Sequence, residues 1–154
     1  MIETPYITHS ETQLTALIHL TIPRADIQGV MEPALRELRT VLAGQGIRPT
    51  GPWLTHHLKI DPQTFDFEVC MPVGKEVVAK GRVQPGQLSA AKVARTIYRG
   101  PYEGLPKAWG EFGKWIAQYG YTVREDVWEC YLAGPESSTD PAEWRTELNR
   151  PLAW

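Results

Sequence analysis

The order of expected elements occurs twice along this chain of 154 residues, and no other feature of the sequence limits its fold as much. Each half predicts a strand, an amphipathic helix that ends at glycine, and then two further strands. Each half also closes on proline followed by an aliphatic residue, at Pro72-Val73 and at Pro151-Leu152. We therefore expect two copies of a β-α-β-β unit, repeat 1 over about 12–74 and repeat 2 over about 88–152.

Alternating and helically spaced apolar residues locate the elements of both repeats. Repeat 1 is expected to contain strands over 12–22, 50–60 and 64–73 and a helix over 27–42, and repeat 2 strands over 88–98, 124–133 and 145–152 and a helix over 105–119. Asp26 is the expected N-cap of the first helix. Because Pro33 lies inside the apolar pattern of this helix, the helix either kinks there or begins near Glu32.

A β-α-β-β unit of this size buries little apolar surface alone, so we expect the two repeats to pack together. The predicted fold class is α+β: a curved antiparallel sheet with two main helices on one face and a central ligand cleft at the seam between the repeats. Residues 1–11 are expected to be a polar lead-in, residues 74–86 a connector, and residues 12–154 a single domain.

Charge and cysteine content argue against several classes of function. Sixteen Lys and Arg residues against eighteen Asp and Glu residues give a net charge of −2. The electrostatic attraction that drives binding to nucleic acid or to anionic membranes is therefore missing. No secretory signal or membrane-spanning run is visible, and the two cysteines, Cys70 and Cys130, do not form a disulfide framework. We expect a cytoplasmic protein that binds neither nucleic acid nor membrane directly.

Sequence motifs for metal ions, phosphates and catalytic nucleophiles are missing from the chain. The adjacent residues His56 and His57 point to opposite faces of a strand, so they cannot bind one metal ion together without distortion. Cys70 and Cys130 lie in apolar strand surroundings, which favours buried inert thiols over nucleophiles. We therefore expect no metal and no organic cofactor.

The strand around Glu129 is the most informative segment for function. Alternation places Trp128, Cys130 and Leu132 on one face and Glu129 and Tyr131 on the other. A carboxylate in an apolar strand is costly to bury without a partner. Glu129 is therefore either on a solvated outer face or the single charge in a cleft that awaits a cation.

Four aromatic residues would supply rings to such a cleft: Trp53, Tyr98, Tyr102 and Tyr131. Aromatic rings bury apolar area and attract positive charge to their faces, while a carboxylate fixes the position of that charge. The combination predicts a site for flat, lipophilic cations.

Several segments together resemble one known family. They are Tyr98–Leu105 (YRGPYEGL) before a Trp-rich helix, Trp128–Leu132 (WECYL), Asp140-Pro141 leading to Thr146–Leu148 and Pro151, and in the first half Gly51-Pro52 and Glu68–Val73 (EVCMPV). They are similar to segments of the gyrase-inhibitor-like small-molecule-binding domains, the effector-binding domains of bacterial AraC-type and MerR-type multidrug-responsive regulators. The resemblance spans roughly residues 12 to 152.

The resemblance implies two β-α-β-β repeats around a hydrophobic pocket for varied, often cationic, compounds. It also implies that Glu129 meets the positive charge of the ligand. His56 and His57 stand where relatives often carry Tyr, and a protonated His would oppose a cationic guest. No helix-turn-helix precedes residue 12, so we expect a stand-alone module and not a transcription factor.

Three classes of function remain open at this point. The leading hypothesis is a binding protein that sequesters or senses small lipophilic, cationic aromatic compounds. The second is a hydrolase of strained electrophilic natural products such as cyclopropane-bearing toxins, with Glu129 as general acid or base and Tyr131 or Tyr98 assisting. The third is a protein-interaction module that modulates DNA gyrase, the activity of the protein for which the family is named.

Overall fold

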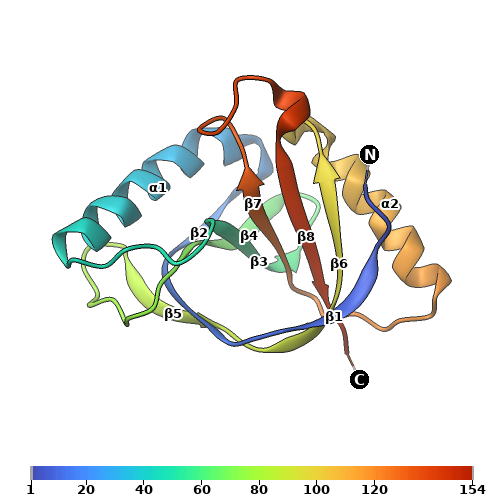
Figure 1. Cartoon of the computed structure of the whole chain (residues 1–154), viewed down its shortest axis with the longest axis horizontal. Helices are drawn as coiled ribbons and strands as arrows, with labels where there is room; N and C mark the ends of the chain where they lie inside the picture. The colour runs from blue at the N-terminus through green and yellow to red at the C-terminus, as the bar shows by residue number, and fades with distance from the viewer. Residues whose placement is uncertain (1, 154) are drawn as a thin grey trace. The chain divides into compact units, whose positions relative to one another are not determined.

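The computed structural model describes residues 2–153, and their side chains except those of Gln28 and Ile60. The chain divides into two compact units, one made of Met1–Ser10 with Ala91–Trp154 and one made of Glu11–Ala90. Figure 1 shows the elements in chain order. They are β1 (Tyr6–Ser10), β2 (Gln13–Pro23), α1 (Ile27–Gly44), β3 (Leu54–Ile60), β4 (Thr64–Pro72), β5 (Gln84–Leu88), β6 (Ala91–Arg99), α2 (Leu105–Gln118), β7 (Val127–Ala133) and β8 (Arg145–Pro151). Three single turns of 3-10 helix join them: η1 (Arg24–Asp26), η2 (Tyr102–Gly104) and η3 (Pro141–Glu143).

The predicted repetition is confirmed, because β2-α1-β3-β4 and β6-α2-β7-β8 follow the same order. In the unit Glu11–Ala90 the strands lie in the order β3-β4-β2-β5, and in the other unit in the equivalent order β7-β8-β6-β1. All the strand pairs within the two units are antiparallel. The α+β class predicted from the sequence is therefore confirmed.

Two strands were not expected from the sequence, and each pairs with a strand of the repeat that is not next to it on its C-terminal side. The strand β1 lies in the expected lead-in and pairs with β6, while β5 lies at the end of the expected connector and pairs with β2. The strand expected over 88–98 is thus divided, since β5 ends at Leu88 and β6 begins at Ala91. Neither short strand shows a long alternating pattern, so pairing with a neighbour and not local propensity defines it.

Strand β5 contains two residues that usually interrupt strands, Pro85 and Gly86. Pro85 is tolerated because β5 is an edge strand of the Glu11–Ala90 unit. A Cβ atom on Gly86 would overlap the side chain of Leu17 on β2, so the close approach of the two strands requires glycine there.

Most other element boundaries agree with the sequence. Helix α1 begins at Ile27 with Asp26 as its N-cap and contains Pro33 within its length, so it does not begin near Glu32. The turn after β3 is held by Asp61, whose carboxylate accepts hydrogen bonds from the backbone N–H groups of Gln63 and Thr64. Strand β7 begins at Val127, three residues later than the predicted Arg124.

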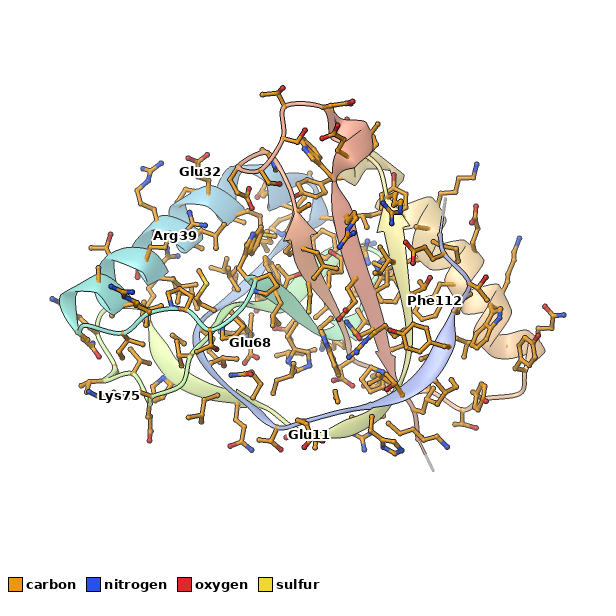
Figure 2. All side chains as sticks on the ribbon, viewed as in Figure 1. Glu11, Glu32, Arg39, Glu68, Lys75 and Phe112 are labelled. Atoms are coloured by element: carbon orange, nitrogen blue, oxygen red, sulfur yellow. The ribbon has the colours of Figure 1, made fainter. Side chains whose placement is uncertain are left out.

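Each unit buries one face of its own helix against one face of its own strands. Glu32 and Arg39, on the opposite side of α1, point to solvent, and Phe112 lies between α2 and the strands of its unit (Figure 2). The core under α1 includes Leu38, Leu42, Phe67, Val69 and Met71, and the core under α2 includes Ala94, Tyr98, Ala108, Phe112, Ile116 and Leu148. None of the helices in residues 2–153 is long and apolar enough to cross a membrane.

Tyr98 fixes the start of α2 within its unit. Its ring is buried, and its hydroxyl donates a hydrogen bond of 2.8 Å to the carbonyl oxygen of Pro101. A Cβ atom on Gly104, the residue before α2, would overlap this hydroxyl. Because the φ angle of Gly104 is −84°, its backbone suits any residue, and the need for glycine here is steric.

The substitution Gly104→Ala is expected to lower the free energy of unfolding by about 1–3 kcal/mol, because the methyl group must displace a buried, hydrogen-bonded ring. Gly110→Ala and Gly113→Ala are matched controls within α2, where a Cβ atom meets nothing within 4 Å. They are expected to raise the free energy of unfolding by about 0.5–1 kcal/mol, as alanine favours helix. Urea denaturation measures all three, and equal stabilisation in all three would contradict the steric role of Gly104.

Candidate functional site

Glu129 lies on the face of β7 that is turned toward α2. Its register partner on β8 is Leu148, a member of the core under α2. Only 8% of the Glu129 surface is exposed. The alternative of a solvated outer face is therefore wrong, and the carboxyl group is buried between sheet and helix.

Two hydrogen bonds hold the buried carboxyl group of Glu129. The indole N–H of Trp109 on α2 donates to its Oε2 at 2.6 Å, and the hydroxyl of Tyr131 donates to its Oε1 at 2.7 Å. Alternation along β7 explains the second bond, since residues two apart share a face. The sequence placed Trp109 on the apolar side of its helix, and no pattern in the sequence indicated that its indole nitrogen meets Glu129.

Burial raises the pKa of Glu129, while the hydrogen bonds from Tyr131 and Trp109 oppose this change without cancelling it. No Lys, Arg or His side chain in the described part of the chain forms an ion pair with this carboxyl group. The site thus holds a buried acid that is hydrogen-bonded but has no ion-pair partner among the described residues. A cation placed beside it would favour the charged form and lower the pKa again.

Aromatic rings from three segments of the same unit form a row that begins at Tyr131, a hydrogen-bond partner of Glu129. Tyr102 on η2 contacts the ring of Tyr131 edge to face at a centroid distance of 5.8 Å, and it contacts Trp144 at 5.0 Å. Burial, together with the charges of Glu136 and Glu129, raises the pKa of Tyr102 to about 12. The hydroxyl of Tyr102 is therefore neutral at pH 7 and can donate or accept a hydrogen bond.

The structure brings together three of the five residues that the sequence assigned to ligand binding, namely Glu129, Tyr131 and Tyr102. Tyr98 lies in the same unit on β6, and its hydroxyl is already bonded to Pro101. Trp53 belongs to the unit Glu11–Ala90 and packs against the core of that unit. The ligand-binding role of Trp53 stays a prediction from the sequence.

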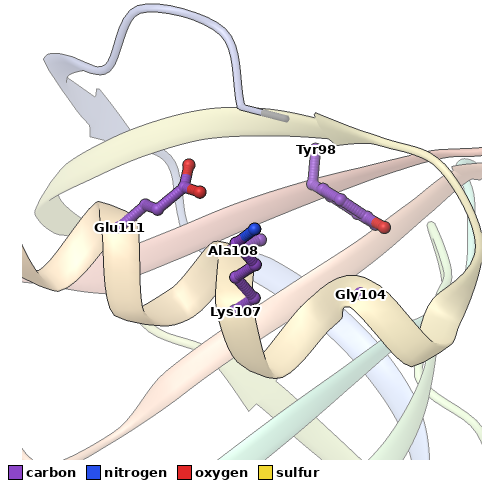
Figure 3. A pocket seen from close by; sticks show the side chains of 5 residues that line it. All are labelled: Tyr98, Gly104, Lys107, Ala108 and Glu111. Atoms are coloured by element: carbon purple, nitrogen blue, oxygen red, sulfur yellow. The ribbon is translucent and has the colours of Figure 1, made fainter.

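A groove of about 340 Å³ lies beside Tyr98 (Figure 3). Tyr98, Gly104 and Ala108 line it together with two exposed side chains of α2, Lys107 and Glu111. Its charged groups are surface residues, in contrast to the buried carboxyl group of Glu129. We therefore place the candidate site at Glu129 and not in this groove.

The two adjacent histidines of β3 have different surroundings, as their alternation predicted. His56 lies beside Glu68 of β4, with 3.3 Å between Nδ1 and Oε1, whereas the ring of His57 stacks on Phe67 at 5.2 Å. Burial, followed by the charges of His56 and Arg24, lowers the pKa of His57 to about 4. His57 is therefore neutral at pH 7, and the expected opposition of this residue to a cationic guest does not arise.

No group of three or more His, Cys, Asp and Glu side chains among the described residues is arranged to hold a metal ion. Both cysteines are free thiols. Burial, and to a smaller extent the charge of Glu147, raises the pKa of Cys130 to about 12. Since the thiolate is the reactive form, Cys130 is not a nucleophile at neutral pH.

Comparisons with known proteins support a small-molecule site. The sequence profile of the GyrI-like small molecule binding domain matches residues 5–153. A comparison with curated protein sequences gives no significant match. Among solved structures, the C-terminal domain of EcmrR is 20% identical, with a TM-score of 0.87 over 97% of both chains. In the complex of EcmrR with DNA, this chain covers 57% of the length of the EcmrR chain.

Two further structures share the fold at lower identity. SAV2435, solved with tetraphenylphosphonium bound, is 15% identical, with a TM-score of 0.72 over 98% of this chain and 94% of that one. A hydrolase from Listeria innocua is 13% identical, with a TM-score of 0.66 over 97% of this chain and 91% of that one. At these identities the likeness shows the fold alone.

The raised pKa of Glu129 predicts how its replacement affects stability. Both folded and unfolded chains carry the protonated acid at low pH. As the pH rises above the ordinary pKa of Glu, about 4.3, the unfolded chain loses its proton first, and the folded state of the wild type becomes relatively less stable. Glu129→Gln removes this effect, so its stability advantage over the wild type should grow with pH and level off above the raised pKa.

Urea denaturation of ligand-free wild type and Glu129→Gln between pH 4 and pH 8 measures this difference. Glu111→Gln, the same chemical change on the exposed side of α2, is the control and should alter stability by less than about 0.5 kcal/mol. A difference between Glu129→Gln and wild type that does not vary with pH would show that the burial of Glu129 does not disfavour its charged form.

Proposed function

Since the chain belongs to the family of GyrI-like small-molecule-binding domains, we propose that it binds lipophilic aromatic cations at Glu129. The observation that carries this proposal is the buried carboxyl group without an ion-pair partner, bonded to Tyr131, whose ring contacts Tyr102, which in turn contacts Trp144. A buried acid is costly for the free protein. A bound cation offsets that cost, whereas a neutral ligand does not. The carboxyl group therefore favours cationic over neutral ligands.

The rings and the carboxylate contribute to binding in different ways. Aromatic faces bury the apolar surface of any flat or propeller-shaped guest and attract positive charge through their quadrupoles. The carboxylate adds an attraction that a neutral guest of the same shape does not receive. We propose Glu129, Tyr131, Tyr102, Trp144 and Trp109 as binding residues, and Tyr98 and Trp53 remain in the proposal from the sequence.

Because only 8% of the Glu129 surface is exposed, access of a ligand to it requires movement of neighbouring side chains. Tyr102 contacts Tyr131, and Trp144 contacts Tyr102. Both come from segments outside the long helix and the strands, since Tyr102 lies in the single turn η2 and Trp144 lies between η3 and β8. Such segments rearrange at lower cost than strands in a sheet. We propose that these two rings move to admit the ligand and then stack on it.

Two properties of the chain bear on the setting of this function. Both cysteines are free, which fits the reducing cytoplasm proposed for this protein. The net charge of −2 gives no attraction to nucleic acid, so the proposed partners are small molecules.

A hydrolase is the second candidate, and one observation favours it. A carboxyl group with a raised pKa beside a tyrosine hydroxyl is the arrangement of a general acid, and Glu129 and Tyr131 provide it. Tyr98, the other tyrosine considered for this role, donates its hydroxyl to Pro101 instead. Product analysis after incubation with a cyclopropane-bearing electrophile distinguishes the two functions, since a binding protein returns the compound unchanged.

Tetraphenylphosphonium is expected to bind the wild type, and Glu129→Gln should weaken this binding by roughly 1–3 kcal/mol, the range for loss of a charged partner. Triphenylphosphine oxide, a neutral compound with similar rings, should bind Glu129→Gln as well as it binds wild type. Isothermal titration at pH 7.5 measures both ligands.

Two further variants complete this experiment. Glu111→Gln makes the same change in net charge away from the site and should leave both affinities unchanged. Trp53→Ala should weaken both ligands alike, because lost ring area does not distinguish charge. Equal losses of both ligands in Glu129→Gln would assign Glu129 a structural role, and no loss of either would place the binding site elsewhere.

The affinity for tetraphenylphosphonium should also depend on pH, because this cation has no titratable group. At low pH the empty site holds protonated Glu129, and the cation must displace the proton. Affinity is therefore expected to rise with pH through the raised pKa of Glu129 and then to become constant. Titrations from pH 5 to pH 9 measure this profile, and Glu129→Gln should show no such rise. An identical profile in both proteins would assign the pH dependence to another group.

A further inference from the structure

Thr146 lies in the middle of the face that carries Glu129, yet its hydroxyl group has no hydrogen-bond partner. On β8 it is paired in register with Tyr131 on one side and with Tyr98 on the other. None of its surface is exposed. Its Oγ1 is one of two buried side-chain polar atoms in the described part of the chain without a partner, the other being Nε of Arg145.

The hydroxyl groups next to Thr146 are already committed to other partners. Tyr131 donates to Glu129, and Tyr98 donates to the carbonyl oxygen of Pro101. Thr96, a buried threonine two residues from Tyr98 on the same face, donates to the carbonyl oxygen of Glu3 at 2.7 Å. Buried hydroxyl groups in folded proteins are nearly always bonded, so the state of Thr146 requires an explanation.

Comparison of the two repeats indicates why the position is unusual. Thr146 stands five residues before Pro151, and the residue five before the equivalent Pro72 is Phe67. Phe67 is completely buried in the core under α1 and stacks on its register partner His57. Repeat 1 thus fills this position with a large apolar ring, whereas repeat 2 has a smaller side chain with a free polar atom.

We infer that Thr146 is a specificity-determining residue of the Glu129 site and forms a hydrogen bond with a polar substituent of the bound cation. This inference rests on the proposed function. Residues diagonal to each other on neighbouring antiparallel strands lie about 7–8 Å apart, and Glu129 and Thr146 are such a pair, because Glu129 is opposite Leu148. The preferred ligand is an aromatic cation with a hydroxyl or amino group about one ring away from its charge.

The chemistry of threonine fits this role. Its hydroxyl group can donate one hydrogen bond and accept two, so it can serve either a hydroxyl or an amino substituent. Glu129 sets the preference for positive charge, and Thr146 adds a preference for polarity at a fixed position. A cation that carries only hydrocarbon rings meets the first requirement and leaves Thr146 unpaired.

The experiment compares tetraphenylphosphonium with its three monohydroxylated derivatives, in which one phenyl ring carries a hydroxyl group in the ortho, meta or para position. Isothermal titration gives the affinity of each cation for wild type and for Thr146→Val, which keeps the shape and removes the hydroxyl. At least one derivative should bind wild type about 2- to 10-fold more tightly than the parent cation. This gain should vanish in Thr146→Val, while the affinity for the parent cation stays the same.

Thr96→Val is the matched control, since it removes a buried hydroxyl from the same face. That hydroxyl already donates a hydrogen bond to the carbonyl oxygen of Glu3 within the protein. It should lower the free energy of unfolding and keep the gain of the hydroxylated cation. Thr146→Val breaks no internal bond, so it should be at least as stable as wild type in urea denaturation.

The outcomes separate this inference from the proposed function. Loss of tetraphenylphosphonium binding in Glu129→Gln, with the same hydroxyl gain in wild type and Thr146→Val, would overturn the role of Thr146 alone. A wild type that binds all four cations equally would also overturn the role of Thr146. A Thr146→Val variant that loses stability would overturn it as well, because the loss would indicate a structural partner such as a buried water molecule. A wild type that binds none of the four cations would overturn both.

Discussion

The hydrogen bonds of one buried carboxyl group connect the sheet and the helix of the second repeat. Glu129 on β7 accepts one bond from Tyr131 on its own strand and one from Trp109 on α2. These bonds make its burial tolerable, because a buried acid without partners would be far more costly. They do not cancel the effect of burial, which still raises the pKa of Glu129. Burial thus disfavours the charged form of Glu129 in this unit, and the two hydrogen bonds limit that penalty.

The two repeats share an order of elements but not their chemistry. In repeat 1 the helix-facing side of β3 and β4 carries His57 against Phe65 and Phe67, with ring centroids 5.4 and 5.2 Å apart. Burial keeps His57 neutral. In repeat 2 the equivalent side carries Glu129, Tyr131 and Thr146, whose polar atoms include a buried acid and an unpartnered hydroxyl. One copy of the unit fills this face with stacked rings, and the other carries a buried acid and a hydroxyl group without a partner on it.

The positions of β1 and β5 explain why the sequence showed the repeats more clearly than their boundaries. Strand β1 lies directly before repeat 1 and pairs with β6 of repeat 2. Strand β5 lies directly before repeat 2 and pairs with β2 of repeat 1. A strand of five residues with polar or strand-breaking residues has little tendency to form alone. Pairing over a long sequence separation, such as Tyr6 with Arg95, determines both strands. Patterns within a short window do not contain that information.

The sequence by itself determined the α+β class, the repeated order of elements and the family, and it predicted a ligand-binding role for Glu129. These follow from local periodicity, from glycine and proline at element ends, and from the rule that alternate strand residues share a face, which paired Glu129 with Tyr131. The tertiary structure decided whether that face is buried, since burial depends on how α2 packs on β7. It also supplied Trp109 as the second donor, placed Tyr102 against Tyr131 and Trp144 against Tyr102, and left Thr146 without a partner. Such relations join residues far apart in the chain, and only the packing of helix on sheet brings them within hydrogen-bond or van der Waals distance.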